Sequence, residues 1–216
     1  MDRIEAKLIH GAVLLERQYL LLNRLISTNS CALTKFEAAI DSSSQDINNV
    51  LDVYCYVFAL IDHIARYRKI ALSIPKLNQK SAEFRALDSA IGNIKDIRDQ
   101  LQHINNEILN ENSGPLLGAV CWASGGRQFL ATFNDVGLAR SSLGLILNTE
   151  TGKYLRDFCY VYNEDYYDLG DAIKGVEDFN NYTQLVIKIE IDGKPYNSED
   201  HFMALRIDFK EIESMS

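Results

Sequence analysis

The 216-residue chain lacks the features of membrane proteins and of disordered proteins. It has only three prolines and no low-complexity tract, and its composition, 47% hydrophobic and 24% charged, is typical of folded proteins. Its longest apolar runs, such as residues 53–61, are too short to cross a bilayer. The N-terminus begins with Asp2, Arg3 and Glu5, and not with a basic region followed by an apolar one. We therefore expect a cytoplasmic protein that does not contact membranes.

Signature sequences of cofactor and metal chemistry are also missing. There is no Walker loop, no GxGxxG motif and no GxSxG motif, and the SGGR sequence at residues 124–127 is expected to be a hairpin turn. His63 and His201 each follow an aspartate, but neither has a second histidine or carboxylate at the spacing of a zinc site. The four cysteines form no CxxC pair and do not resemble a disulfide framework. We expect no metal, no cofactor, and buried free thiols.

Negative charge is unevenly distributed along the chain, whose net formal charge is −8. Residues 1–112 contain 13 Lys and Arg against 14 Asp and Glu, a net of −1, whereas residues 113–216 contain 9 against 16, a net of −7. An acidic molecule offers no long-range attraction for phosphate. Any RNA would therefore have to bind a local basic patch in the first half.

The first half of the sequence predicts helices. Apolar residues recur at helical spacing, and the STNS sequence at residues 27–30 and the proline at position 75 are stop signals. Thr34 and Glu37 match a capping box at the start of a short helix. The segment before Pro75 is apolar nearly all round its middle, so it should form the centre of a bundle. We predict helices at residues 3–26, 34–40, 46–72 and 81–109.

After Pro115 the apolar spacing changes to the alternation that is typical of β-strands. The clearest alternation lies at residues 183–191, and a helical insert is expected at residues 167–176. We predict strands at residues 116–123, 127–133, 143–147, 154–162, 183–191 and 202–209. The predicted fold class is α+β, with an N-terminal helical bundle at residues 1–112 and an antiparallel β-rich domain at residues 113–216.

Residues 94–107 carry the strongest candidate for chemistry. Asp99 and His103 are four positions apart on a predicted helix, so the carboxylate can orient the imidazole and favour its protonated form. Arg98 is five positions from His103, which turns the two side chains roughly 140° apart on an ideal helix. A second surface must therefore bring the arginine into the site, and the same helix of a second copy is the simplest candidate.

The sequence R-D-Q-L-Q-H at residues 98–103 resembles the motif of the HEPN family: an arginine, then Asn, Asp or His, and a histidine a few residues later. The resemblance covers roughly the first half of the chain. It implies a helical bundle that dimerises so that two motifs face one cleft, and many HEPN proteins are metal-independent endoribonucleases. On this resemblance His103 would be the general acid/base, Arg98 would stabilise the phosphate, and Asp99 would orient the histidine.

Basic residues near the end of the second long helix extend this candidate site. Together with Asp62, the residues His63, Arg66, Arg68 and Lys69 could line an RNA or nucleotide groove, or they could be the solvated end of a core helix. The residues of the motif could likewise be ordinary surface residues in i,i+4 pairs.

Two further stretches have alternative interpretations. Arg3 and His10 repeat the arginine-to-histidine spacing more loosely on the first helix. The acidic aromatic run YVYNEDYYD at residues 160–168 could contact a basic partner or mimic nucleic acid. The favoured interpretation is a strand end and loop whose tyrosines pack while its carboxylates face water.

The sequence supports two functions of different classes. The first is a HEPN-type endoribonuclease, such as a toxin or an antiviral effector, that acts on RNA as a homodimer. Its β half would recognise the substrate, a neutralising protein partner or a regulator. The second is a non-catalytic module whose helices bind a nucleotide, RNA or a protein partner.

Overall fold

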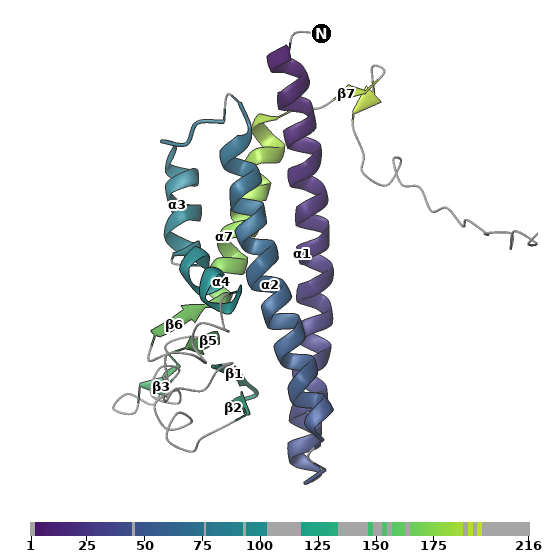
Figure 1. Ribbon diagram of the computed structural model, residues 1–216, viewed down its shortest axis with the longest axis vertical. Helices are drawn as coiled ribbons and strands as arrows, with labels where there is room; N and C mark the ends of the chain where they lie inside the picture. The colour runs from purple at the N-terminus through teal and green to yellow at the C-terminus, as the bar shows by residue number, and fades with distance from the viewer. Residues whose placement is uncertain are drawn as a thin grey trace, which may run out of the picture.

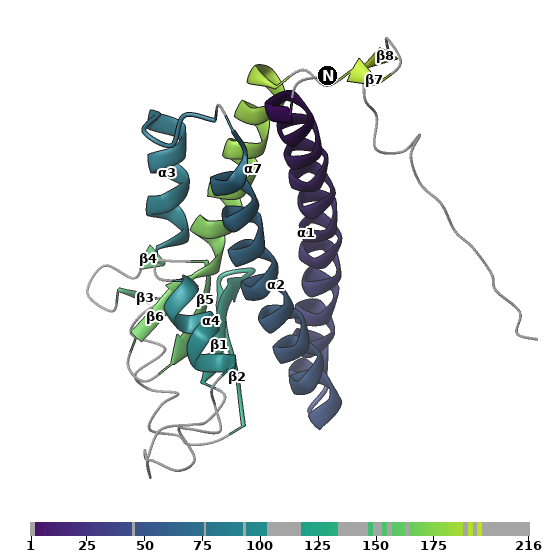
Figure 2. The same cartoon turned by 45° about the horizontal axis from the view of Figure 1, so that its top comes forward.

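The protein has an α+β fold in which N-terminal helices precede a four-stranded antiparallel sheet, as the sequence predicts (Figure 1). Two long helices, α1 (Arg3–Asp41) and α2 (Ile47–Ser73), form an antiparallel hairpin, and the other helices and the sheet lie along α2 (Figure 2). The computed structural model describes residues 3–44, 46–75, 77–92, 94–102, 118–133, 147–148, 153–154, 157–162, 165–187, 190–191 and 194–195.

The first helix is longer than predicted, because it continues through the expected stop at residues 27–30. The hydroxyls of Thr28, Ser30 and Thr34 each donate to the carbonyl four residues earlier, at 2.8–3.0 Å. These polar groups are thereby satisfied inside the helix and do not interrupt it. Phe36 is buried in the core that α1 and α2 share. The predicted separate helix at residues 34–40 is therefore wrong.

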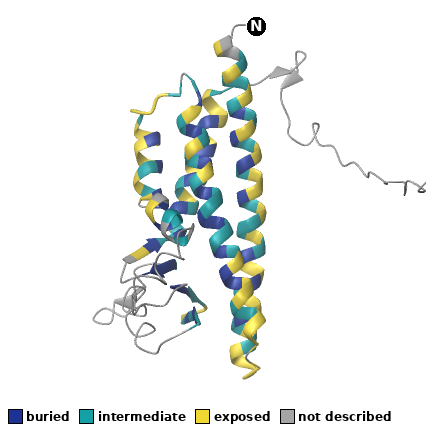
Figure 3. Ribbon diagram, in the orientation of Figure 1, coloured by how far each residue is buried: buried dark blue, intermediate teal, exposed yellow. Residues whose placement is uncertain are grey.

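The second helix matches its prediction closely. Asp46 is the N-cap and accepts a hydrogen bond from the backbone N–H of Asn48 at 2.9 Å. The helix ends at Ser73, directly before Ile74 and Pro75. Its buried residues extend over most of its length (Figure 3): Val53, Tyr54, Val57, Leu60, Ile61, Ile64, Tyr67 and Ala71.

The single helix predicted at residues 81–109 is divided in two. Ser81 caps α3 (Ala82–Ile91), and Gly92 ends it with a φ of 53°, a conformation that glycine adopts without strain. The chain then starts α4 (Ile94–Gln102), which packs against α2. Because Gly92 ends α3, Arg98 and Asp99 of the arginine motif lie on a short helix of their own. Residues 103–109 of the predicted helix lie outside the described residues.

The main sheet has the strand order β2-β1-β5-β6, and every neighbouring pair is antiparallel. Its strands are β1 (Ala119–Ser124), β2 (Arg127–Thr132), β5 (Phe158–Tyr162) and β6 (Asp165–Asp168). The SGGR sequence is the predicted hairpin turn, in which Gly125 and Gly126 have positive φ values. Two short hairpins pair β3 (Leu147–Asn148) with β4 (Lys153–Tyr154) and β7 (Glu190–Ile191) with β8 (Lys194–Pro195). The strand predicted at residues 202–209 lies outside the described residues.

The described part of the acidic aromatic run belongs to β5 and β6 and ends at Asp168, directly before the next helix. Tyr160, Tyr162 and Tyr167 are buried, which agrees with tyrosines that pack in the core. Asp168 caps the following helix by accepting from the N–H of Asp171 at 3.0 Å.

The clearest predicted strand, at residues 183–191, is wrong over its first half, because α7 (Leu169–Val186) continues to Val186. The buried residues Ala172, Val176 and Phe179 follow helical spacing and pack against α2 and α3. Leu185, which belongs to the apparent alternation, is 79% exposed. The alternation of apolar residues over this short run therefore did not predict the structure, because these residues continue the helix that Asp168 caps.

One continuous core joins the helices to the sheet. It contains residues of α1, α2, α3, α4 and α7 together with residues of β1, β2 and β5. The Tyr54 hydroxyl donates to the carbonyl of Gly118 at 2.6 Å, and the Trp122 indole nitrogen of β1 donates to Glu37 of α1 at 2.8 Å. Residues of the core thus lie on both sides of the predicted boundary at residues 112/113, which itself lies outside the described residues.

The cysteines differ from expectation in part. Cys121 and Cys159 are buried as expected, whereas Cys31 and Cys55 are exposed on the helical hairpin. In the described part of the chain, no helix is long and apolar enough to span a membrane.

Candidate functional site

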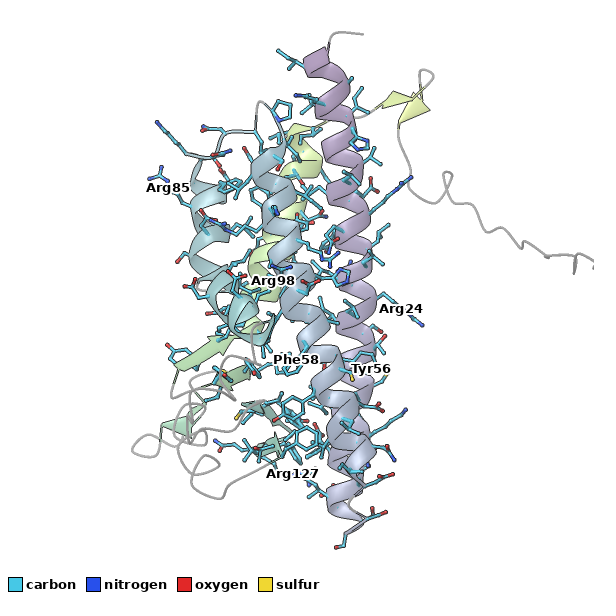
Figure 4. The ribbon with its side chains drawn as sticks, viewed as in Figure 1. Arg24, Tyr56, Phe58, Arg85, Arg98 and Arg127 are labelled. Carbon is cyan, nitrogen blue, oxygen red and sulfur yellow. The ribbon has the colours of Figure 1, made fainter. Side chains whose placement is uncertain are left out.

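The structure brings most of the predicted site residues together in a pocket of about 450 Å³ between α2 and α4. Arg66, Arg68 and Lys69 line it from α2, and Asp99 and Arg98 line it from α4. Figure 4 labels Arg98. These two groups were predicted separately, from segments about thirty residues apart. The buried Ile94 and Ile97 hold α4 on α2 and so bring the two groups together. The result is a pocket lined by four cations.

Asp62 of α2 fixes two of these cations. The Arg98 Nε donates to Oδ1 of Asp62 at 2.7 Å, and the Arg66 Nε donates to Oδ2 at 2.6 Å. Partial burial of Asp62 acts to raise its pKa, but the two guanidiniums outweigh burial and hold the pKa below its usual 3.8. The side chains of Asp62 and Arg98 are 26% and 29% exposed. This ion pair is therefore partly shielded from water and orients Arg98 in the pocket.

The other two cations are held differently. The Arg68 Nε donates to Oδ1 of Asp88 on α3 at 2.8 Å. Lys69 forms no ion pair among the described residues. Four cations therefore face three carboxylates, those of Asp62, Asp88 and Asp99, which leaves one unit of positive formal charge at the pocket. The pocket suits an anion, although the molecule as a whole is acidic.

With respect to the described residues, Arg98 retains donors for a ligand. Its Nε is bonded to Asp62, and its Nη1 is 3.7 Å from Oδ1 of Asp99, beyond hydrogen-bonding distance. A guanidinium has five N–H donors in a fixed plane, so those on the two Nη atoms can bind a phosphate or carboxylate. Asp99 itself is 47% exposed and stands at the rim.

Among the predicted site residues that the structure describes, His63 is the one that does not line this pocket. It faces α1, where the Gln18 side-chain amide donates to its Nδ1 at 2.6 Å and to its backbone carbonyl at 3.1 Å. Burial lowers the pKa of His63 below 6.5, and the nearby Arg66 lowers it further, while Asp62 opposes the shift. His63 therefore favours its neutral form and links α1 to α2.

His103, the predicted acid/base, lies outside the described residues, one position after the end of α4. Its expected pairing with Asp99, and the arrangement of Arg98 and His103 across a second copy, stay predictions. His10 of the looser second motif is exposed on α1, and the side chain of Arg3 is outside the described set.

Sequence reasoning missed the role of Asp62. Its spacing of four residues from Arg66 was a detectable signal, because opposite charges at i and i+4 share a helix face. Its bond to Arg98, 36 residues away, depends on how α4 packs and has no local signal.

The described arrangement can bind an anion and orient it against a fixed guanidinium. Within the described parts of the chain, no three His, Cys, Asp or Glu side chains gather where they could share a metal ion. Comparisons of this chain with protein-family models, with curated proteins and with solved structures found no match.

Proposed function

We propose that this protein is a metal-independent endoribonuclease that holds an RNA phosphate in the pocket between α2 and α4. The observation that carries the proposal is the convergence of Arg98 with Arg66, Arg68 and Lys69 in one pocket. These cations are the local basic patch that an acidic protein needs for RNA. The resemblance of residues 98–103 to the HEPN motif supports the same function.

Arg98 acts on the phosphate. Asp62 bonds its Nε, so the guanidinium plane is set before a ligand arrives and its Nη donors remain for the phosphate oxygens. A preorganised cation stabilises the negative charge that gathers on those oxygens as the phosphorus is attacked. Lys69 and Arg66 add positive charge for the neighbouring phosphates.

His103 moves the proton. As general base it takes the proton of the ribose 2′-hydroxyl, which then attacks the adjacent phosphorus, and as general acid it protonates the leaving 5′-oxygen. Asp99 orients the imidazole. Because Arg98 and His103 diverge by roughly 140° on an ideal helix, we propose that the protein works as a homodimer in which each copy completes the other's site. A cytoplasmic toxin or antiviral effector with a neutralising protein partner is the biological setting that we propose.

A second candidate function is a non-catalytic module that binds RNA, a nucleotide or a protein partner. The ion pair between Asp62 and Arg98 favours it, because that contact also gives the arginine a purely structural role in joining α4 to α2. Such a module would bind its ligand in the same pocket and leave it intact.

Incubation of the purified protein with single-stranded and structured RNA in EDTA separates the two functions. The endoribonuclease is expected to degrade RNA, and Arg98→Ala and His103→Ala are expected to abolish degradation. Arg24→Ala is the matched control, because Arg24 is exposed on α1 and points away from the pocket (Figure 4). Circular dichroism verifies that each variant is folded.

Intact RNA at high protein concentration would reject the catalytic proposal. If that protein still retains RNA in a filter-binding assay, and Arg98→Ala weakens retention, the non-catalytic module is the better description.

A further inference from the structure

A second groove, of about 800 Å³, lies beside the first pocket, between the N-terminal half of α1 and the C-terminal half of α2. Its wall on α1 extends from Ala6 to Gln18, which is ~18 Å along the helix axis at 1.5 Å per residue. The groove is open and long enough for an extended chain rather than for a single compact group.

Two cations line both cavities. Arg66 and Lys69 border the α1–α2 groove and also the α2–α4 pocket. They are three positions apart on α2, so they lie next to each other on one face of the helix. Lys69, which forms no ion pair among the described residues, is available to both sides. The ridge that separates the two cavities is therefore cationic.

The opposite wall adds the positive charge of Lys7 and the imidazole of His10. Lys7 and His10 line the groove from α1, where they are exposed and share a face. No Asp or Glu is among the described lining residues of this groove, in contrast to the pocket, where Asp99 stands at the rim. The cations of the groove are thus less neutralised than those of the pocket, and the groove attracts a polyanion.

Between the cations the surface is aliphatic. Ala6, Gly11, Leu14 and Ile70 contribute to it, and Leu14 is 38% exposed without a ligand. A strand of RNA has the matching alternation, because its phosphates are charged while its bases and riboses present less polar faces.

The polar side chains of the groove that could hydrogen-bond to base edges largely have hydrogen-bond partners within the protein. The Gln18 amide is bonded to His63, and the Ser73 hydroxyl donates to the backbone carbonyl of Lys69 at 2.8 Å. Contacts in the groove would therefore recognise the backbone with little preference for base sequence.

We propose that an RNA strand bound at Arg98 continues over the ridge of Arg66 and Lys69 into the α1–α2 groove, where Lys7 and His10 contact its phosphates. This inference rests on the proposed RNA-binding function and extends it to a second surface. It assigns to α1 a role in holding substrate, and it makes binding depend on the length of the RNA.

The test compares a short and a long RNA. Fluorescence anisotropy would measure binding of 2′-O-methyl oligouridylates of two and twelve nucleotides, which cannot be cleaved by attack of their own 2′-hydroxyl. The double variant Lys7→Gln/His10→Gln is compared with wild type and with Lys35→Gln, an exposed lysine of α1 that lines neither cavity. All positions changed are exposed, and urea unfolding verifies equal stability.

We expect the double variant to bind the twelve-nucleotide RNA about tenfold more weakly at low salt, with a salt dependence of log K that is shallower by about 0.7 for the lost lysine contact. Its affinity for the dinucleotide should equal that of wild type. Unchanged binding of the long RNA, or an equal loss for both lengths, would overturn the inference and leave the proposed function standing. If wild type binds neither RNA, the proposed RNA-binding function itself fails, and the inference fails with it.

Discussion

Arg98 of α4 and Asp62 of α2 form a hydrogen-bonded ion pair of 2.7 Å across the wall of the candidate site. Because Asp62 also bonds Arg66, one carboxylate fixes two of the four cations of the pocket. The same contact therefore positions a functional guanidinium and joins α4 to α2.

Asp62→Asn should lower the free energy of unfolding by about 1–2 kcal/mol, because it leaves two guanidiniums with a neutral partner in a partly buried place. Urea unfolding monitored by circular dichroism measures the change. Asp99→Asn is the matched control, and we expect it to cost less than about 0.5 kcal/mol, since Asp99 is more exposed and 3.7 Å from Arg98. Equal losses in the two variants would contradict the anchoring role of Asp62.

Lys69→Ala should separate ligand binding from stability. Lys69 lines both cavities and forms no ion pair among the described residues, so its removal should leave the midpoint of urea unfolding unchanged. RNA affinity should fall, and the salt dependence of log K should become shallower by about 0.7. Arg68→Gln is the contrasting variant, because it breaks the bond to Asp88 of α3 and should reduce stability as well. An RNA affinity that is the same in Lys69→Ala and in wild type would contradict the proposal that RNA binds in these cavities.

Stability should fall as the pH drops below 6.5, in part because of His63. The pKa of His63 is below 6.5 in the folded protein, whereas in the unfolded chain it is the ordinary 6.5. At a pH between these two pKa values, the unfolded chain binds more protons than the folded protein. The contribution is present above pH 6.5 and is lost as the pH falls toward the folded pKa. His63→Asn keeps an acceptor near Gln18 but cannot titrate, so its melting temperature should decrease less than that of wild type between pH 7.5 and pH 5.5. Parallel curves for the two proteins would contradict this assignment.

Glu37 should be a strong link between α1 and the sheet. One of its oxygens accepts from the Trp122 indole nitrogen at 2.8 Å and the other from the Ser124 hydroxyl at 3.1 Å. Glu37→Ala should cost about 1–3 kcal/mol, because it leaves the buried indole donor without a partner. Trp122 is the sole tryptophan, so its fluorescence follows unfolding directly.

Asp41→Ala is the control for this link. It removes the ion pair with Arg127 on the same side of α1, but both side chains are more than half exposed, so the loss of stability should be smaller than that of Glu37→Ala. A larger loss of stability in Asp41→Ala than in Glu37→Ala would show that the main link between α1 and the sheet is the Asp41–Arg127 ion pair instead.

Gly175→Ala should destabilise the contact of α7 with α3. A Cβ at this position would lie 2.5 Å from the Cβ of Ala90, and overpacking of this kind costs about 1–3 kcal/mol. Gly170→Ala on the same helix meets its nearest atom at 3.4 Å and should be neutral or stabilising, since alanine favours helix. Thermal unfolding of the two variants provides the comparison, and a stabilised Gly175→Ala would contradict the close packing.

Local signals predicted α2, the two glycines of the β1–β2 turn and the division of the chain into helices followed by a sheet. These local signals failed at two segments where one pattern of residues indicated a helix and another indicated a helix end or a strand. The hydroxyls of Thr28 and Ser30 have carbonyl partners inside α1, so the segment that contains them does not end the helix. The alternation that includes Leu185 is too short to exclude a helix.

The candidate site was predictable in its composition but not in its geometry. The basic residues of α2 and the Arg98 motif were both evident in the sequence. Their convergence depends on the turn at Gly92 and on the burial of Ile94 and Ile97, which are tertiary effects. His63, in contrast, lies on the side of α2 that faces α1, bonded to Gln18.

The position of α7 has a consequence for synthesis on the ribosome. The apolar faces of α2 and α3 that receive Phe179 are complete long before α7 emerges, because 84 residues separate the end of α4 at Gln102 from the end of α7 at Val186. At 5–20 residues per second this interval is roughly 4–17 s. During it the nascent helices expose Tyr67 and Phe84 to other chains and to chaperones, so the native core closes only after α7 has been made.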